Sequence, residues 1–230
     1  MSTISPVPSP KVHQLKIALR DISPLIWRRV LVTSDTTIAF LHDILQTVMG
    51  WEDIHLHRFR IYGKAYGVYR PGGIIFDDNP HRIRLTDFRF RPGERFIYEY
   101  DFGAWWCHDI RLERVIPLDP KRCYPVCIGG ASACPPEDCA GPAGYRAYLD
   151  TYDSGAALWQ AREDMAVLAQ RLLVFMDGGP RPTDEDEEWA DAFERLRLRL
   201  QAEPGSFNLR AVNQALRQLT EEGSCTFASS

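Results

Sequence analysis

The sequence predicts an α+β protein in which a mixed β-sheet cradles one helix in a β-grasp-like order, ββαβββ, followed by C-terminal helices. Near the start, His13–Arg20 alternates apolar and polar residues, which is typical of a half-buried strand, and Ile26–Val32 (IWRRVLV) is interpreted as a second strand. Ser23 and Pro24 lie between them and favour a turn. The chain is therefore expected to begin with a hairpin.

A helix is predicted over Asp35–Met49, where apolar residues recur at helical spacing. Asp35 or Thr36 is expected to cap its start, and Gly50 to end it in a left-handed conformation. The apolar stripe that defines the buried face consists of Ile38, Leu41, Ile44, Leu45, Val48 and Met49.

Further strands are predicted at Phe96–Tyr100 and Cys107–Ile116, and the composition becomes helical after residue 143. We divide the chain accordingly. Residues 1–11 form a polar, proline-rich leader expected to be disordered, residues 12–142 an α+β core domain with a cysteine-rich loop, residues 143–223 a helical region packing on that core, and residues 224–230 a tail.

The composition is that of an ordinary globular protein: 230 residues, 45% hydrophobic and 25% charged, with a formal net charge of -4. A general nucleic-acid binder normally carries a basic footprint, so the net charge argues against that class. No apolar run is as long as a membrane helix requires, and the first residues do not resemble a signal peptide. We therefore expect a cytoplasmic protein that does not enter a membrane.

Four cysteines lie within one short stretch: Cys123, Cys127, Cys134 and Cys139. They are separated by three, six and four residues, which differs from the two-residue knuckle of common zinc fingers. One interpretation is a zinc site. Another is a turn-rich loop whose cysteines are small buried fillers. Disulfides are disfavoured for a protein in a reducing compartment.

If zinc binds there, the number of protein ligands decides the chemistry. Cys127, Cys134 and Cys139 would be joined by Cys123 or His108. Three ligands and a water would indicate hydrolysis, with Glu137 or Asp138 as the base. Four ligands would indicate a structural ion.

Histidines supply two more candidates. His108 lies on the apolar face of its predicted strand, either as a buried, hydrogen-bonded residue or as a ligand. His55 and His57 are two positions apart and would share a strand face. They would chelate a metal if a third ligand came from elsewhere; otherwise one is solvated and the other hydrogen-bonded.

A cluster of arginines interleaved with phenylalanines gives a nucleic-acid alternative, because basic and aromatic side chains together bind single strands. An exposed edge balanced by acidic residues explains the same pattern. The arginines are Arg82, Arg84, Arg89, Arg91 and Arg95.

Several short motifs together resemble the Ri-plasmid (pRiA4b) ORF-3-like family, some members of which carry the label TnpR. The resemblance covers residues 12–150 well and the remainder loosely. It is carried by PLIWRR at 24–29, FLH at 40–42, MGW at 49–51, HLH at 55–57 with Phe59, YEYDFG at 98–103 with Trp106 and His108, PVC at 125–127, PPEDC at 135–139, GY at 144–145, and Phe207 with Val212 and Asn213.

Membership would imply an accessory protein of plasmids and transposons, without a firm activity. The chain departs from the family pattern at Ala104, where an acidic residue is common, and at Ala140, where a glycine pair usually begins. We therefore expect a binding or interaction module with an unknown protein partner, and leave enzymatic activity open. The candidate functional face consists of His55, His57, Asp101, Trp106, Glu137 and Asp138.

Overall fold

The computed structural model describes residues 11–69, 73, 75–76, 78–152, 155–183, 186–201 and 207–226. These residues form two compact units. The first contains Met1–Ser132 together with Ser206–Ser230, and the second contains Ala133–Gly205. The predicted leader, except for Lys11, and residues 227–230 of the predicted tail lie outside the described residues.

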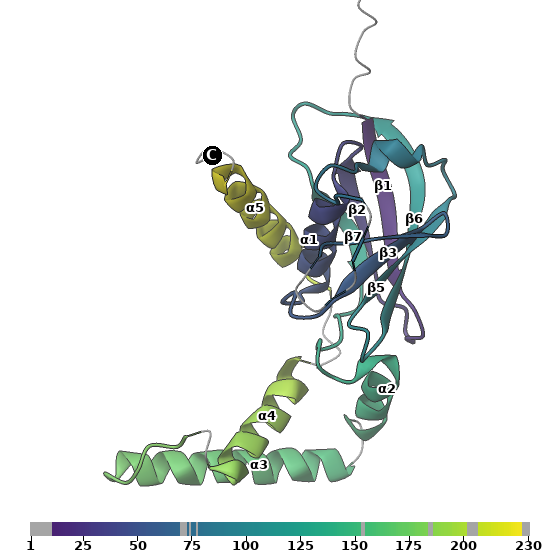
Figure 1. Cartoon of the computed structure of the whole chain (residues 1–230). Helices are drawn as coiled ribbons and strands as arrows, with labels where there is room; N and C mark the ends of the chain where they lie inside the picture. Colours follow the sequence, from purple (N-terminus) through teal and green to yellow (C-terminus); the bar gives the residue numbers. More distant parts are fainter. Residues whose placement is uncertain are drawn as a thin grey trace, which may run out of the picture. The chain divides into compact units, whose positions relative to one another are not determined.

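The first unit is built on a seven-stranded sheet with the order β4-β3-β5-β6-β1-β2-β7 in the residues that the structure describes. Figure 1 shows this sheet with helix α1 lying against it. Its strands are β1 (Lys11–Leu19), β2 (Trp27–Thr33), β3 (His57–Ile61), β4 (Lys64–Tyr66), β5 (Arg95–Tyr100), β6 (Trp106–Pro117) and β7 (Val126–Ala131).

All of the described strand pairs are antiparallel. The predicted α+β class, with helices in the C-terminal part, is confirmed. The predicted ββαβββ order and the mixed sheet are not, because β3 to β7 all follow α1 and no described pair is parallel. Interior strand β1 pairs antiparallel with β2 and with the long strand β6, where a β-grasp has a parallel pair.

Helix α1 spans Ile38–Met49, and its N-cap lies one residue after Thr36 and two after Asp35, the two predicted caps. Thr37 is the N-cap, and its hydroxyl accepts a hydrogen bond from the Phe40 amide at 3.1 Å. Gly50 ends the helix at φ 79°, as expected. The predicted apolar stripe is buried against the sheet, and each such side chain contributes about 1.5–3 kcal/mol.

Arg28 fastens the C-terminal end of α1 to the sheet. Its guanidinium donates to the carbonyl oxygens of Val48 at 3.0 Å, Trp27 at 2.9 Å and Ala131 at 3.0 Å. The side chain is buried, and a cation near the last turn of a helix also favours the helix dipole.

Helix α5 (Leu209–Thr226) packs against α1 and β7, and Figure 1 shows it beside α1. Asn213 on this helix acts as an extra partner for the sheet edge. Its amide accepts from the Cys127 backbone N–H at 2.8 Å and donates to the Cys127 carbonyl at 2.9 Å. The C-terminal helix thereby continues the hydrogen bonding of β7.

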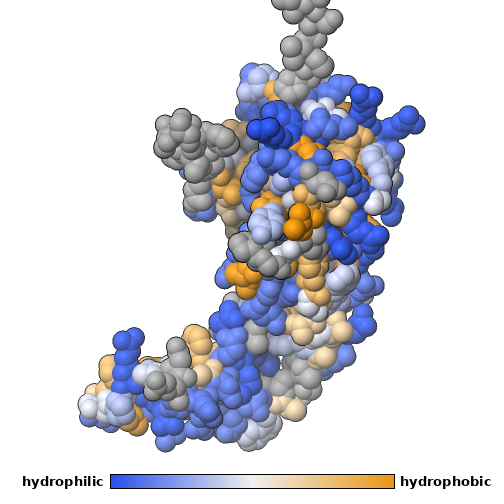
Figure 2. Space-filling view, in the orientation of Figure 1, coloured by the Kyte–Doolittle hydropathy of each residue, from blue (hydrophilic) through white to orange (hydrophobic). Residues whose placement is uncertain are grey.

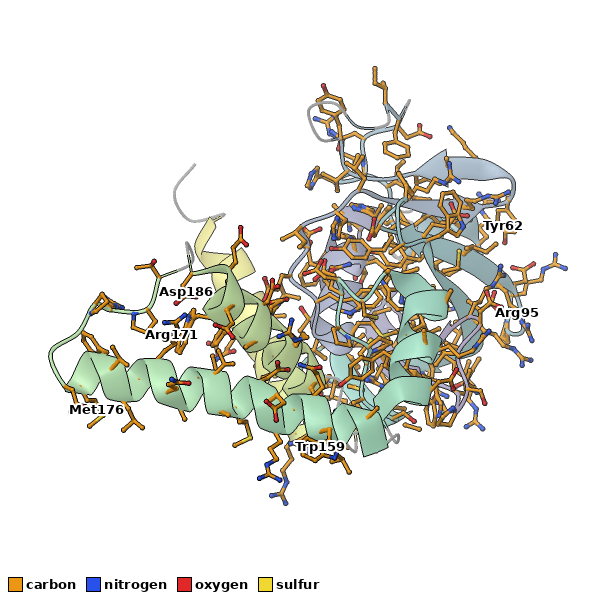
Figure 3. All side chains as sticks on the ribbon, turned by 90° about the horizontal axis from the view of Figure 1, so that it is seen from below. Tyr62, Arg95, Trp159, Arg171, Met176 and Asp186 are labelled. Carbon is orange, nitrogen blue, oxygen red and sulfur yellow. The ribbon has the colours of Figure 1, made fainter. Side chains whose placement is uncertain are left out.

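The second unit contains α2 (Gly141–Tyr152), α3 (Gly155–Met176) and α4 (Glu187–Gln201). Buried Asp164 on α3 receives the guanidinium of Arg195 from α4 at 2.8 Å. Arg171 and Asp186 form a second pair at 3.0 Å and point toward each other in Figure 3.

Large apolar side chains of α3 remain exposed, among them Leu158, Trp159, Met165 and Met176. Figure 2 shows hydrophobic residues at the surface of this unit beside hydrophilic ones. Within the described residues, no helix has the length and apolar character needed to cross a membrane.

Candidate metal centre

His42 lies on the face of α1 that packs against the sheet, and its side chain is buried. Its Nδ1 atom is 2.7 Å from the Tyr98 hydroxyl on β5. Its Nε2 atom is 2.7 Å from a carboxylate oxygen of Asp53, which lies in the loop after α1. Both ring nitrogens are thus held by polar groups inside the core.

These contacts form a closed ring of hydrogen bonds. The Gln46 amide nitrogen donates to the Tyr98 hydroxyl at 2.8 Å, and the Gln46 oxygen accepts from the Asp53 backbone N–H at 3.2 Å. The Tyr98 oxygen accepts from Gln46, and its single proton is available to Nδ1 of His42, 2.7 Å away. In this arrangement Nε2 of His42 carries a proton and donates it to Asp53.

Burial reinforces this assignment at Tyr98. The phenol is fully buried, and desolvation raises its pKa well above the ordinary value for tyrosine. The hydroxyl therefore keeps its proton and has one hydrogen to donate within this ring of contacts.

His57 is the first residue of β3 and faces the core, where it is buried. Its ring is stacked on that of His42, with centroids 3.5 Å apart and planes 10° from parallel. The Val68 backbone N–H approaches Nε2 of His57 at 3.4 Å. Two imidazoles from α1 and β3 thus lie side by side in the interior.

Aromatic residues surround this pair. Tyr98 contacts both imidazoles, at 5.9 Å from each ring centroid. The Trp51 ring centroid lies 5.3 Å from that of Tyr100 and also 5.3 Å from that of His108. The Trp51 and His108 ring planes are 78° apart, an edge-to-face contact. Aromatic rings therefore line the buried side of the polar cluster, where the low dielectric strengthens electrostatic interactions.

His108 on β6 is a second, distinct feature of this core. Its ring is fully buried, and neither nitrogen has a hydrogen-bond partner of regular geometry among the described residues. Burial lowers its pKa to about 4, although the nearby backbone of Tyr98 and Trp106 acts weakly in the opposite direction. His108 is therefore neutral at physiological pH.

One group of candidate metal ligands gathers in the described residues, namely His42, Asp53 and His57, whose ligand atoms all lie within 4.8 Å of one another. Imidazole and carboxylate are common ligands of zinc and other divalent transition metals. The side chain of Asp53 is 35% exposed while that of His42 is 3% exposed, so the carboxylate side of the group is open to solvent.

Metal binding would need a local rearrangement of this group. Zinc bonds of about 2.0–2.2 Å at a tetrahedral angle place two donor atoms about 3.3 Å apart, whereas His42 Nε2 and Asp53 now share a proton at 2.7 Å. The parallel imidazole planes must also tilt for their lone pairs to converge on one ion. An ion would take the place of the shared proton.

The sequence-predicted histidine pair is divided by the structure. His57 joins the centre, but His55 precedes β3 and lies 3.7 Å from the carboxylate of Asp101. Trp106 is fully buried in the aromatic core. The His55/His57 hypothesis required a third ligand. The structure instead groups His57 with two others, His42 from α1 and Asp53 from the following loop, and His55 is not in this group.

The four cysteines fall in both units. Cys123 and Cys127 belong to the first, and Cys134 and Cys139 to the second. Cys127 is buried, and its thiol donates to the Gly129 carbonyl at 3.4 Å. Burial raises the pKa of Cys139 to about 11, which disfavours the thiolate form that binds metal. The zinc site at these cysteines remains a prediction.

The remaining predicted residues are dispersed. Glu137 is buried and Asp138 is exposed, both in the second unit. Arg82, Arg84, Arg89 and Arg91 lie in the segment before β5, and Arg95 is the first residue of that strand. Arg84 lies 3.9 Å from Asp35.

Sequence reasoning missed His42, Gln46 and Asp53. The signal was present for the first two, because both interrupt the apolar stripe of α1 with polar residues on its buried face. Asp53 carried no such signal. It lies in a loop with φ 57°, and its approach to His42 depends on how the chain turns after Trp51.

Two relatives share this fold or sequence. The chain is 33% identical over 143 residues to the uncharacterized protein y4hQ of Sinorhizobium fredii (strain NBRC 101917 / NGR234), covering 60% of this chain and 72% of that protein. It also resembles the crystal structure of MM3350, a protein of unknown function from Methanosarcina mazei Go1. The identity is 33% and the TM-score 0.58, over 64% of this chain and 84% of the other.

The family model described as plasmid pRiA4b ORF-3-like protein matches residues 11–170. That range includes the whole of the hydrogen-bonded ring and both stacked histidines. The resemblance noted from the sequence motifs is thereby confirmed, and the chain belongs to the plasmid pRiA4b ORF-3-like family.

Proposed function

We propose that this chain is a binding module whose first unit holds a divalent metal ion, with zinc as the best match, between His42, Asp53 and His57. The observation that carries the proposal is the convergence of two buried imidazoles and one carboxylate within 4.8 Å. Imidazoles and carboxylates are the ligands of many three-residue zinc sites.

The surrounding contacts support this function. Tyr98 and Gln46 fix the orientation of His42, as hydrogen-bonding partners around a metal site orient the ligands themselves. Asp53 lies on the exposed side of the group and gives an ion a path from solvent. The proposal is limited to binding, and the ion either stabilises the joint between α1 and β3 or presents an open position to a ligand.

The test uses the full chain, purified without a histidine tag, stripped with chelator and titrated with zinc by calorimetry. We expect about one ion per chain, bound through three protein ligands. Asp53→Asn keeps the oxygen that accepts from His42 Nε2 but removes the charge, so we expect affinity to fall at least about tenfold while the fold is retained.

Asp21→Asn is the matched control, because Asp21 has the same left-handed backbone, at φ 59° against 57° for Asp53. Its affinity should equal that of the unmodified chain. Unchanged binding by Asp53→Asn contradicts the proposal. Cobalt substitution separates it from the cysteine alternative, since a thiolate-to-cobalt charge-transfer band that disappears in Cys127→Ser would place the ion on cysteine.

A further inference from the structure

A row of basic side chains crosses the sheet on the face opposite α1. The strand register pairs Arg29 with Lys16, Lys16 with Arg111, and Arg111 with Arg95. Directly paired residues of antiparallel strands project to the same side. These four residues, which we call the basic row, therefore form one line across β2, β1, β6 and β5.

Burial confirms which face carries the row. The residues flanking its members along each strand are buried in the core, whereas Arg95 and Arg111 are exposed and Lys16 and Arg29 are half-buried. Figure 3 shows Arg95 projecting outward from the sheet. With neighbouring strands about 4.8 Å apart, the row is about 14 Å long.

Acidic partners neutralise one end of the row. Glu113 receives the guanidinium of Arg29 at 2.6 Å, and this contact lowers the pKa of Glu113 to about 2. Arg95 and Arg111 form no ion pair with any residue that the structure describes. The other carboxylates of this face are engaged elsewhere, Asp109 with Arg20 and Glu99 with Arg58.

Like charges directly opposite one another destabilise a sheet, and here three successive cross-strand pairs are cationic. Sheet stability alone therefore does not account for the row. An aromatic residue accompanies it: Trp27, two positions before Arg29 on the same face, has the Arg29 guanidinium 4.9 Å and the Lys16 ammonium 5.3 Å from its ring centroid.

We propose that the basic row is a binding surface for single-stranded nucleic acid. A regular line of cations matches a phosphate backbone, and an adjacent tryptophan matches exposed bases, the two features by which sheets hold single strands. Because the whole chain has a net charge of -4, the attraction depends on this local line of cations. The inference is independent of the metal centre, which lies on the other side of the sheet.

The surface differs from the arginine cluster indicated by the sequence. Arg95 is common to both, but the register adds Arg111, Lys16 and Arg29 from strands distant in sequence. Arg82 and Arg91 are exposed in the segment before β5 and are not part of the row. These two arginines therefore offer a control with the same change of charge.

The experiment measures fluorescence anisotropy of a labelled single-stranded oligonucleotide of about 16 nucleotides, with the full chain in chelator and at several salt concentrations. We expect Arg95→Gln with Arg111→Gln to weaken binding about tenfold. The slope of log affinity against log salt should fall by about 1.4, because two phosphate contacts are lost. Thermal unfolding should show the double variant at least as stable as the unmodified chain.

Arg82→Gln with Arg91→Gln should leave both affinity and salt slope unchanged. Equal losses in the two double variants would overturn the assignment to the row, as would oligonucleotide binding that is insensitive to Arg95 and Arg111. Binding of duplex DNA or of poly-glutamate as tightly as the single strand would overturn the assignment to single-stranded nucleic acid.

Discussion

The imidazole rings of His42 and His57 lie parallel, 3.5 Å apart, although one belongs to α1 and the other to β3. This stack joins the helix to the sheet at the point where Tyr98 and Asp53 hold His42 in place. It also means that two candidate ligands are adjacent before any ion binds, so that a modest tilt of the rings is the main rearrangement required.

Replacing His57 by phenylalanine separates the stacking role from the ligand role. His57→Phe keeps an aromatic ring against His42 but removes both nitrogens. We expect zinc binding to be lost. We also expect the free energy of unfolding to fall by about 1 kcal/mol, because the Val68 N–H loses a weak acceptor. Calorimetric titration and urea denaturation of the chelated protein measure the two effects.

The prediction for His57 has a matched control on the neighbouring histidine. His55→Phe changes a half-exposed residue outside the ligand group, so zinc affinity should be retained. If His57→Phe binds zinc normally, His57 is not a ligand, and the stack is structural.

Gln46 donates to the Tyr98 hydroxyl and accepts from the Asp53 N–H, and Gln46→Glu is expected to tighten zinc binding. With a carboxylate at this position, the Tyr98 hydroxyl and the Asp53 N–H both find an acceptor. Tyr98 can then accept the proton of His42 Nδ1, which leaves the Nε2 lone pair for the ion. We expect an increase in affinity of about tenfold, measured by competition with a chromophoric chelator.

The same substitution should destabilise the metal-free protein, because it adds a carboxylate to a buried network. Gln46→Leu provides the opposite case, since it removes the hydrogen bonds to both Tyr98 and Asp53. A Gln46→Glu variant with weaker zinc binding than Gln46→Leu would contradict the proposed proton arrangement.

The sequence was sufficient to predict α1 and the strands on both sides of it, because apolar periodicity reports which face of an element is buried. It identified Gly50 as the helix end because glycine readily adopts the left-handed conformation that ends a helix. The sequence could not give the number of strands after α1, since β4 has only three residues and β7 contains two glycines, and neither shows clear alternation.

The candidate site was predicted only through His57. Its other members come from α1 and the following loop, and their convergence depends on tertiary packing that a periodic pattern does not encode. The neighbouring residues Arg28 and Arg29 show the same limit. They form one basic pair in the sequence, but neighbouring strand residues point to opposite faces. Arg28 therefore lies in the core and Arg29 on the basic row.

Arg28 should therefore matter far more to stability than its neighbour. Arg28→Met retains length but leaves the carbonyl groups of Val48 and Ala131 without their donor. We expect the free energy of unfolding to fall by about 3 kcal/mol or more, because buried charge-assisted hydrogen bonds are lost. Urea denaturation at neutral pH measures this.

Arg29→Met is the control for Arg28, since it removes the same group one residue later. Its ion pair with Glu113 is partly exposed, so we expect a loss of about 1 kcal/mol or less. Equal losses from the two variants would show that the buried guanidinium contributes no more than a surface pair.

His108 should make the fold sensitive to acid. Burial lowers the pKa of His108 to about 4 in the folded protein, below its value of 6.5 in an unfolded chain. As pH falls below about 6.5, His108 becomes protonated in the unfolded chain but stays neutral in the folded chain. The free energy of unfolding therefore declines until about pH 4. The full effect of this one group is about 3 kcal/mol.

His108→Leu should flatten that part of the pH profile, measured by urea denaturation of chelated protein. A residual slope is expected from His13, whose pKa is also lowered by burial. At neutral pH the variant should be as stable as the unmodified protein or more so, because two buried nitrogens without regular partners are removed. His81→Leu, which changes an exposed ring, should leave the profile as it is. If His108→Leu instead loses stability equally at pH 7 and pH 5, the ring contributes by packing against Trp51 rather than by its protonation.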